Sequence, residues 1–180
     1  MKIAISVGHN PTAPGAAFEN YTEYSEVILI ASFLVQNLQR KGHLAYIIGT
    51  GGLKHKVSQI NDIEPEVAVE IHLNAANTYA HGCETLYCPG SKIGKQLAQN
   101  IQTELNKVTN NRDRGVKEGW YHMIKPPNPK AQKDYFLAET CCPAIIIEPF
   151  FIDNIERNRF IDNLELQNEM AKSIMKGILK

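Results

Sequence analysis

Three short apolar runs, each about the length of a β-strand, end on a residue that can bind a metal ion or transfer a proton. They span residues 3–9, 67–72 and 144–148, and they end at His9, His72 and Glu148. Segments with helical periodicity separate them, and strands that alternate with helices form a mostly parallel sheet with helices on both faces. Functional groups of such sheets gather in the crevice outside the carboxyl ends of the strands. We therefore expect the two imidazoles and the carboxylate to converge.

The rest of the chain continues this alternation. Helices are predicted where apolar residues recur every three to four positions, at 27–38, 56–61, 93–105 and 164–178. Further strands are predicted at 43–48, 82–88 and 135–138. The polar region 110–133 is predicted to be the least regular part. The pattern predicts one α/β domain over residues 1–180, with a twisted, mostly parallel sheet of about six strands and helices on both faces.

Composition excludes some classes of partner. The 180 residues suffice for one domain, and 19 basic residues balance 19 acidic ones. This balance argues against nucleic acid or an anionic membrane as the main partner. The first apolar stretch is too short for the core of a signal peptide, and no apolar run approaches the roughly 20 residues that span a bilayer. We expect a soluble protein that is not exported by the signal-peptide route.

Four cysteines occur, at positions 83, 88, 141 and 142. We interpret them as small buried residues of a reduced protein. The spacing of Cys83 and Cys88 is loose for a zinc site, and adjacent cysteines rarely chelate one ion together. A cysteine metal site is therefore not expected.

The two histidines differ in what their surroundings suggest. His9 follows Gly8 in a loop, where a histidine is most often an ordinary polar residue. His72 shares the polar face of a strand with Asn74, so it is partly desolvated and needs a partner. A metal ion or a backbone carbonyl would serve that need equally well.

The carboxylates also differ. Glu148 follows four apolar residues and precedes Pro149, so poor solvation predicts a raised pKa and favours a functional role. Glu23 precedes a helix, where Asn20 as the N-cap with Glu23 three residues later would form a capping box. Glu26, one turn further on, competes with Glu23 for any role at a site.

Several motifs occur in a fixed order along the chain. They are SVGH at 6–9, Glu23 ahead of a long amphipathic helix, EIHLNA at 70–75, RGVK at 114–117 and IEPFFIDN at 147–154. Gly82-x-Glu84-x-x-Tyr87 and Pro143 before the last apolar run complete the set. In order and spacing, they resemble the zinc-dependent N-acetylmuramoyl-L-alanine amidases of the amidase-3 type. Within that family, the chain looks most similar to catalytic domains of bacteriophage endolysins.

This resemblance implies a ligand set and a reaction. One Zn2+ per chain would be held by His9, Glu23 and His72, and Glu148 would take a proton from the zinc-activated water and deliver it to the departing amine. The substrate would be peptidoglycan, cut between N-acetylmuramic acid and the L-alanine of the stem peptide. The positions matched to substrate binding are Asn10, Asn74, Glu84 and Arg114.

The chain departs from the common family pattern at some positions. Many members have Asp-Pro-Gly-His-Gly where this chain reads SVGHN at 6–10, and Glu-Thr-Gly-Phe where it reads EPFF at 148–151. Residues 118–133 are longer than the family needs. There, Trp120, Tyr121 and His122 are expected either to line the substrate cleft or to belong to a packed surface loop.

Other functions remain open at this level. A zinc peptidase that cuts within the stem peptide, or a cell-wall-binding module without activity, would use a similar fold. For targeting, the enzyme would either work alone or depend on a separate wall-binding domain or subunit. A phage lysin would wait in the host cytoplasm for release to the wall, whereas an autolysin would act directly at the wall.

Overall fold

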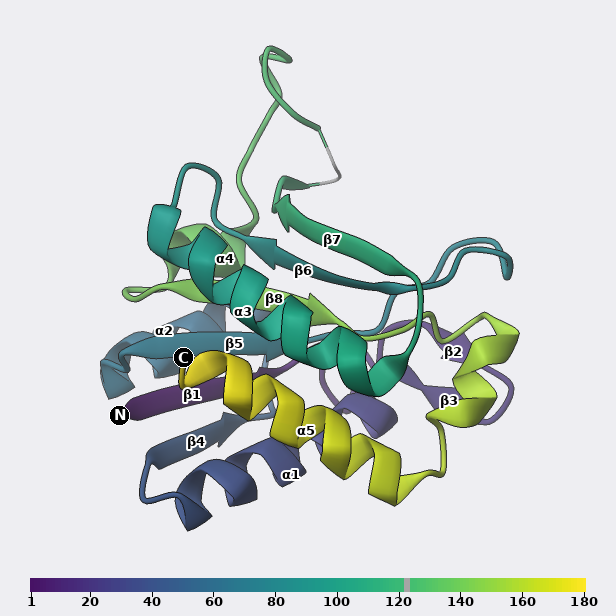
Figure 1. Ribbon diagram of the computed structural model, residues 1–180. Helices are drawn as coiled ribbons and strands as arrows, with labels where there is room; N and C mark the ends of the chain where they lie inside the picture. The colour runs from purple at the N-terminus through teal and green to yellow at the C-terminus, as the bar shows by residue number, and fades with distance from the viewer. Residues whose placement is uncertain (122–123) are drawn as a thin grey trace.

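A six-stranded sheet forms the centre of the molecule in the computed structural model, which describes residues 1–121 and 124–180 (Figure 1). The strands lie in the order β4 (Leu44–Ile48), β1 (Lys2–Val7), β5 (Val67–Ile71), β8 (Ala144–Glu148), β6 (Cys83–Tyr87) and β7 (Asp113–Glu118). Neighbouring strands are parallel except β8 and β6. The predicted α/β fold with a mostly parallel sheet is confirmed.

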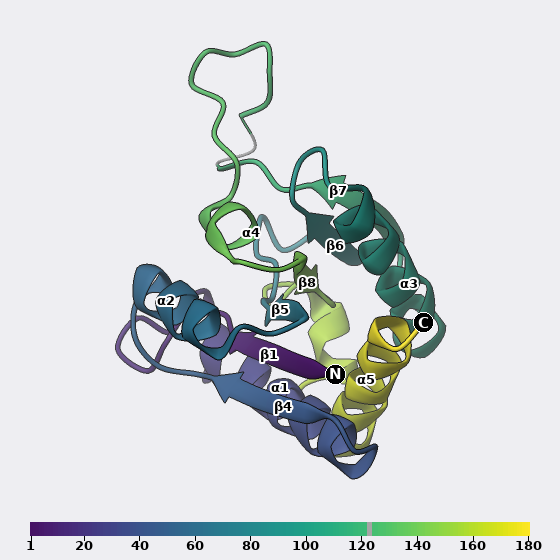
Figure 2. The ribbon, with the colours of Figure 1, turned by 90° about the vertical axis from the view of Figure 1, so that its left-hand side faces the viewer.

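Helices cover both faces of the sheet (Figure 2). One face carries α1 (Glu23–Arg40), α3 (Lys92–Thr109) and α5 (Leu164–Ile178). The opposite face carries the shorter helices α2 (Leu53–Ile63) and α4 (Tyr135–Glu139). Among the described residues, no helix is both long and apolar enough to cross a membrane.

Side-chain alternation along the strands sorts the core into two clusters. In β1, Ile3 and Ile5 pack with the cluster beneath α1 and α5, whereas Ala4 packs with the cluster on the α2 side. Further along the α2 side, polar residues replace apolar ones toward the carboxyl ends of the strands. Ser6 of β1 lies beside Glu70 of β5, where the Ser6 hydroxyl donates to the Glu70 carboxylate at 2.8 Å. This polar end of the sheet is where the candidate site forms.

Short elements surround this end of the sheet. The hairpin of β2 (Ala17–Phe18) and β3 (Tyr21–Thr22) and the 3-10 helix η2 (Ile155–Arg159) lie at the right of Figure 1. Both sequence segments follow a strand of the sheet, β1 and β8 respectively. They frame the loops that leave the carboxyl ends of these strands.

Two predicted elements were wrong. Residues 135–138 form a helix, α4, because Asp134 caps it by accepting from the Leu137 amide at 3.2 Å, and because Phe136 and Leu137 pack into the α2-side cluster. A short apolar run does not distinguish a strand from a buried helical turn. The region predicted to be irregular contains β7, an edge strand with half-exposed side chains.

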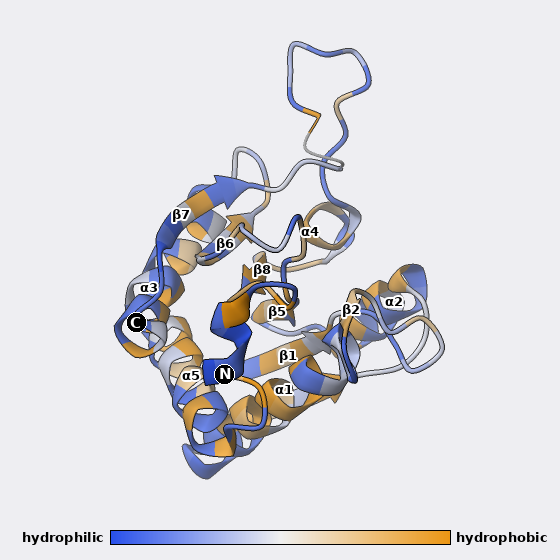
Figure 3. Ribbon diagram, turned by 90° about the vertical axis from the view of Figure 1, so that its right-hand side faces the viewer, coloured by the Kyte–Doolittle hydropathy of each residue, from blue (hydrophilic) through white to orange (hydrophobic). Residues whose placement is uncertain are grey.

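The polar sequence of β7 follows from its place at the edge. It pairs with β6 alone, so it needs little apolar surface and avoids pairing with other chains. Figure 3 shows the contrast, since β1 in the middle of the sheet is coloured mainly as hydrophobic and β7 mostly as hydrophilic.

The prediction that the cysteines are buried, reduced residues is confirmed only in part. All four are free thiols, but only Cys83 is buried, and Cys141 is exposed. The prediction of buried cysteines is confirmed for Cys83 alone, because Cys88 and Cys142 are half-buried and Cys141 lies at the surface after α4.

Candidate active site

Three potential metal ligands converge at the carboxyl ends of β1 and β5. His9, Glu23 and His72 each offer one ligand atom, and these atoms lie within 4.8 Å of one another. Each carboxylate oxygen of Glu23 contacts one imidazole ring. Oε2 lies 3.0 Å from His9 Nε2, and Oε1 lies 2.8 Å from His72 Nδ1. Two imidazole nitrogens and one carboxylate form a donor set that suits zinc. The residues therefore fit the metal that the sequence resemblance implies.

The start of α1 decides which glutamate faces the histidines. The N-cap is Thr22, whose hydroxyl accepts from the Ser25 amide at 3.2 Å while the Ser25 hydroxyl accepts from the Thr22 amide at 3.1 Å. The predicted capping box of Asn20 and Glu23 is wrong. Because Thr22 takes the capping role, Glu23 is the first helical residue and its side chain is free to turn toward the site.

Glu23 and Glu26 point to different partners. Besides the two histidines, Glu23 Oε1 accepts from the Leu73 amide at 3.0 Å. Burial alone would raise the pKa of Glu23, but hydrogen bonds from the two histidines hold it at about 2. Glu26 Oε2 instead accepts from Gln167 Nε2 at 3.1 Å, on the side of α5. Glu26 is therefore not part of this group.

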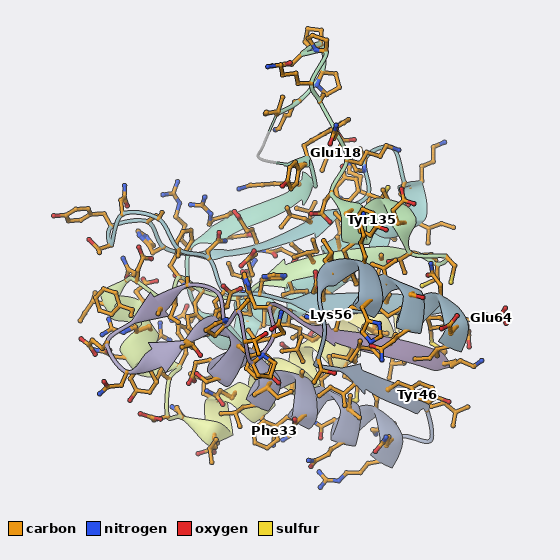
Figure 4. The ribbon with its side chains drawn as sticks, turned by 180° about the vertical axis from the view of Figure 1, so that it is seen from behind. Phe33, Tyr46, Lys56, Glu64, Glu118 and Tyr135 are labelled. Carbon is orange, nitrogen blue, oxygen red and sulfur yellow. The ribbon has the colours of Figure 1, made fainter. Side chains whose placement is uncertain are left out.

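His9 is held in an unusual backbone conformation. Its φ is 63°, in the left-handed region that residues with a side chain seldom adopt. Lys56 of α2 donates through Nζ to the carbonyl oxygens of both His9 and Val7, and only 2% of Lys56 is exposed. Figure 4 views the molecule from the α2 side, with Lys56 labelled. A buried ammonium thus fixes the backbone on both sides of Gly8.

His72 has carboxylates at both ring nitrogens. Its Nε2 lies 3.2 Å from Glu70 Oε2, on the side away from Glu23. A carboxylate behind a ligating histidine fixes the tautomer and orientation of the ring. This arrangement differs from a core histidine bonded to a backbone carbonyl. Sequence reasoning missed the role of Glu70, although strand alternation already placed it on the same face as His72.

Two glycines provide the space that the ligands occupy. A Cβ on Gly8 would lie 2.7 Å from His72 Nδ1. A Cβ on Gly15, whose φ is +82°, would lie 2.5 Å from His9 Cδ2 and 2.6 Å from Glu23 Oε2. Because real Cβ atoms do not approach so closely, any side chain here would displace the three ligands.

Glu148 lies at the end of β8, beside the histidines. It lines the same cavity as His9 and His72, which has a volume of about 380 Å³. Its Oε2 is buried and has no hydrogen-bond partner among the described residues. Burial raises the pKa of Glu148 to about 8, which confirms the raised pKa predicted from the sequence. A carboxyl group beside potential metal ligands, with one buried oxygen that has no partner among the described residues, is suited to proton transfer.

Three of the positions matched to substrate binding form one cluster. Glu84 Oε1 accepts from Asn74 Nδ2 at 3.1 Å, and Glu84 Oε2 accepts from Arg114 Nε at 2.6 Å and from Lys117 Nζ. Glu84 is paired with Glu148 across β6 and β8. Both carboxylate oxygens of Glu84 thus accept hydrogen bonds from protein side chains. These bonds connect Glu84 to Asn74, Arg114 and Lys117 beside Glu148.

The fourth position, Asn10, closes a turn. Its Oδ1 accepts from the amide and hydroxyl of Thr12 and from the Ala13 amide. Asn10 also lines the cavity of Glu148.

The aromatic residues of the long segment have different positions. The Trp120 indole donates to Glu118 Oε2 at 3.3 Å. Tyr121 lines a second cavity beside the first one. His122 lies outside the described residues.

Comparisons with known proteins agree with this site. The amidase-3 family model, described as N-acetylmuramoyl-L-alanine amidase, matches residues 3–180. The crystal structure of an N-acetylmuramoyl-L-alanine amidase from Clostridium difficile is 27% identical, with a TM-score of 0.86 over 99% of this chain and 94% of that chain. The catalytic domain of the CD27L endolysin, which targets the same bacterium, is 28% identical, with a TM-score of 0.81 over 99% and 97% of the two chains.

A sequence relative gives a similar result. An uncharacterized cell wall amidase of Bacillus anthracis is 31% identical over 72% of this chain. The matched region covers only 24% of that relative, so the chain corresponds to about a quarter of the longer protein.

Proposed function

Because the chain belongs to the amidase-3 family of N-acetylmuramoyl-L-alanine amidases, we propose that it hydrolyses the amide bond between N-acetylmuramic acid and the L-alanine of the peptidoglycan stem peptide. Residues 1–180 act as one catalytic domain, and the place of action is the bacterial cell wall. The observation that carries this proposal is the convergence of His9, Glu23 and His72 next to Glu148, whose Oε2 lacks a hydrogen-bond partner in the part of the chain that the structure describes.

His9, Glu23 and His72 would hold one Zn2+, since three protein ligands of this kind are typical of catalytic zinc sites. When bound, zinc polarises the amide carbonyl and lowers the pKa of water toward about 7. The buried carboxylate of Glu70 keeps the His72 ring oriented, and Lys56 keeps the His9 backbone in place. These residues hold the ligands in position before the substrate arrives.

Glu148 acts as the general base and then as the general acid. It accepts a proton from the attacking water through its Oε2, which has no competing partner among the described residues. It then delivers this proton to the nitrogen of L-alanine, so that the amine leaves uncharged. Burial keeps the carboxyl pKa high enough for both steps, and the charge of a bound cation would bring it down from about 8 toward neutral pH.

The proposal is tested by digesting purified peptidoglycan and analysing the products by mass spectrometry. An amidase releases intact stem peptides that begin with L-alanine and leaves a lactyl carboxylate on the sugar. A zinc peptidase would release shortened stems, and a binding module would release nothing. Products of either alternative kind would reject the proposed reaction.

Glu148→Gln separates the catalytic group from the metal site. We expect kcat/KM to fall by about 10²- to 10⁴-fold, the range attributed to a general acid or base. Zinc content, measured by atomic emission, should stay at the wild-type value because Glu148 is not a ligand. Full activity in this variant would contradict the assigned role.

A further inference from the structure

A second cavity adjoins the candidate active site, between the start of α2 and the segment that leads into α4. Its volume is about 710 Å³, and Leu53 lines both this cavity and the cavity of Glu148. Figure 4 shows the two sides of this region, with Lys56 labelled on α2 and Tyr135 on α4. The two cavities therefore adjoin each other at Leu53.

The wall opposite α2 is attached to the central sheet. The Gly119 amide donates to the Tyr87 carbonyl at 2.9 Å, which fixes the segment to the end of β6. From there, Tyr121 donates through its amide to the Gln132 carbonyl at 2.7 Å, and Trp120 forms an antiparallel bridge with Lys133. The residues at the base of this long segment are thus paired, and they give the cavity a defined wall.

The lining combines apolar surface with positive charge. Leu53 is 43% exposed and Tyr121 is 52% exposed, which is high for side chains of this kind. Lys54 stands at the α2 side and Lys133 at the opposite wall. None of the described residues that line the cavity is acidic. A ligand with negative charges and apolar portions would match this surface.

The two halves of the substrate differ in charge. Before cleavage, the glycan strand is neutral, because its acetamido groups are uncharged and the lactyl carboxyl group is part of the amide. The stem peptide carries free carboxylates, including its C-terminal one. Charge complementarity therefore selects the peptide, and not the sugar chain, as the occupant of a cavity that contains lysines on both sides.

We propose that this cavity is the subsite for the stem peptide beyond its L-alanine, where Lys54 and Lys133 pair with peptide carboxylates while Tyr121, Tyr135 and Leu53 pack on the chain. This inference rests on the proposed function. In this arrangement, the scissile amide lies at the metal site and the peptide passes Leu53 into the second cavity.

The test measures binding of the released peptide, without any requirement for catalysis. L-Ala-γ-D-Glu-L-Lys-D-Ala is titrated into the zinc-loaded protein and into the variant Lys54→Met/Lys133→Met, which keeps the aliphatic length but removes both charges. We expect the double variant to bind about tenfold more weakly, as two partly screened ion pairs would give. A peptide with carboxamides in place of its carboxylates carries two ammonium groups and no negative charge, so it should bind the wild type no more tightly than the double variant.

Lys92→Met/Lys95→Met is the matched control, because both lysines are exposed on α3, on the other face of the sheet. This variant should bind the peptide like the wild type. Equal binding by the Lys54/Lys133 variant, or a selective loss of affinity for the GlcNAc-MurNAc disaccharide in that variant, would overturn the proposal.

Hydrolysis of a minimal substrate, N-acetylmuramoyl-L-alanine, tests the proposed function separately. This substrate does not reach the second cavity, so the Lys54/Lys133 variant should cleave it at the wild-type rate. If the wild type cleaves neither this substrate nor peptidoglycan, the proposed function fails, whatever the peptide titration shows. If the double variant loses this activity as well, the lysines support the active site itself and the subsite is wrong.

Discussion

At the residue scale, the candidate site depends on groups that hold the ligands as much as on the ligands themselves. Glu70 orients His72, Lys56 fixes the His9 backbone, and Gly15 leaves the space that the ligands occupy. Motif resemblance pointed to the ligands and to Glu148. The motif at 70–75 contains Glu70 but assigned it no role, and nothing in the sequence shows whether a lysine or a loop glycine faces a site.

Lys56→Met is expected to weaken zinc binding by about 10- to 100-fold, the range for removal of a group that positions a metal ligand. The substitution leaves the carbonyls of Val7 and His9 without their donor, so His9 can leave its left-handed conformation. Competition with a fluorescent chelator measures the affinity. Lys2→Met is the control, because Lys2 also donates to a backbone carbonyl, that of Ile63 at 2.8 Å, but at the opposite end of the strand. Equal affinities in both variants would exclude a positioning role for Lys56.

Gly15→Ala is expected to abolish zinc binding, because its Cβ would overlap His9 and Glu23. Gly42→Ala serves as the matched control. Both glycines have a positive φ, +82° and +83°, so both substitutions carry a similar backbone cost of about 1 kcal/mol. A Cβ on Gly42 meets nothing within 4 Å. Isothermal titration with zinc should therefore detect a loss in the first variant only, and normal binding by Gly15→Ala would refute the steric argument.

At the scale of elements, local capping chemistry placed Glu23, the proposed third metal ligand. Sequence reasoning chose Asn20 as the N-cap, since asparagine followed by a glutamate three residues later fits the capping pattern. The β2–β3 hairpin occupies that position instead and moves the helix start to Thr22. Capping and packing together made 135–138 a helix, because Asp134 caps it and its apolar residues pack into the core on the α2 side.

The position of the N-cap can be measured. Thr22→Ala should lower the free energy of unfolding by about 1 kcal/mol, the usual cost of a lost N-cap. Asn20→Ala should have an effect below about 0.5 kcal/mol, as expected for a surface substitution. Urea denaturation of the zinc-free protein gives both values. The reverse order of effects would restore Asn20 as the cap.

At the scale of the whole molecule, the sheet gathers several carboxyl groups at one end. The negative charges of the neighbouring Glu23, Glu70 and Glu84 help to raise the pKa of Glu148. Among the described residues, Glu148 Oε2 has no hydrogen-bond partner. In the zinc-free protein, this group therefore opposes folding once it ionises.

This arrangement predicts a pH-dependent effect of Glu148→Gln on stability. The pKa of Glu148 is about 8 in the folded protein against an ordinary value of 4.5, so the folded state retains a proton that the unfolded state loses. Its contribution is complete below pH 4.5 and is lost as the pH rises toward 8. In zinc-free protein, Glu148→Gln should raise the Tm relative to wild type at pH 8 and have little effect at pH 4. Calorimetry at both values checks this, and an equal change in Tm at both would contradict a buried, titrating carboxyl group.

The sequence by itself determined the α/β class, the central strands and the candidate residues at their ends, because apolar periodicity and strand alternation are local properties of the chain. Only the tertiary structure decided that Glu23 and not Glu26 faces the histidines, that Glu70 and Lys56 support them, and that a second cavity adjoins Leu53. Strand alternation places Glu70 beside His72, but the other features depend on contacts between residues far apart in the chain, such as those of Lys56 with Val7 and of His72 with Glu23. Packing of the elements sets such contacts, and no local pattern in the sequence encodes them.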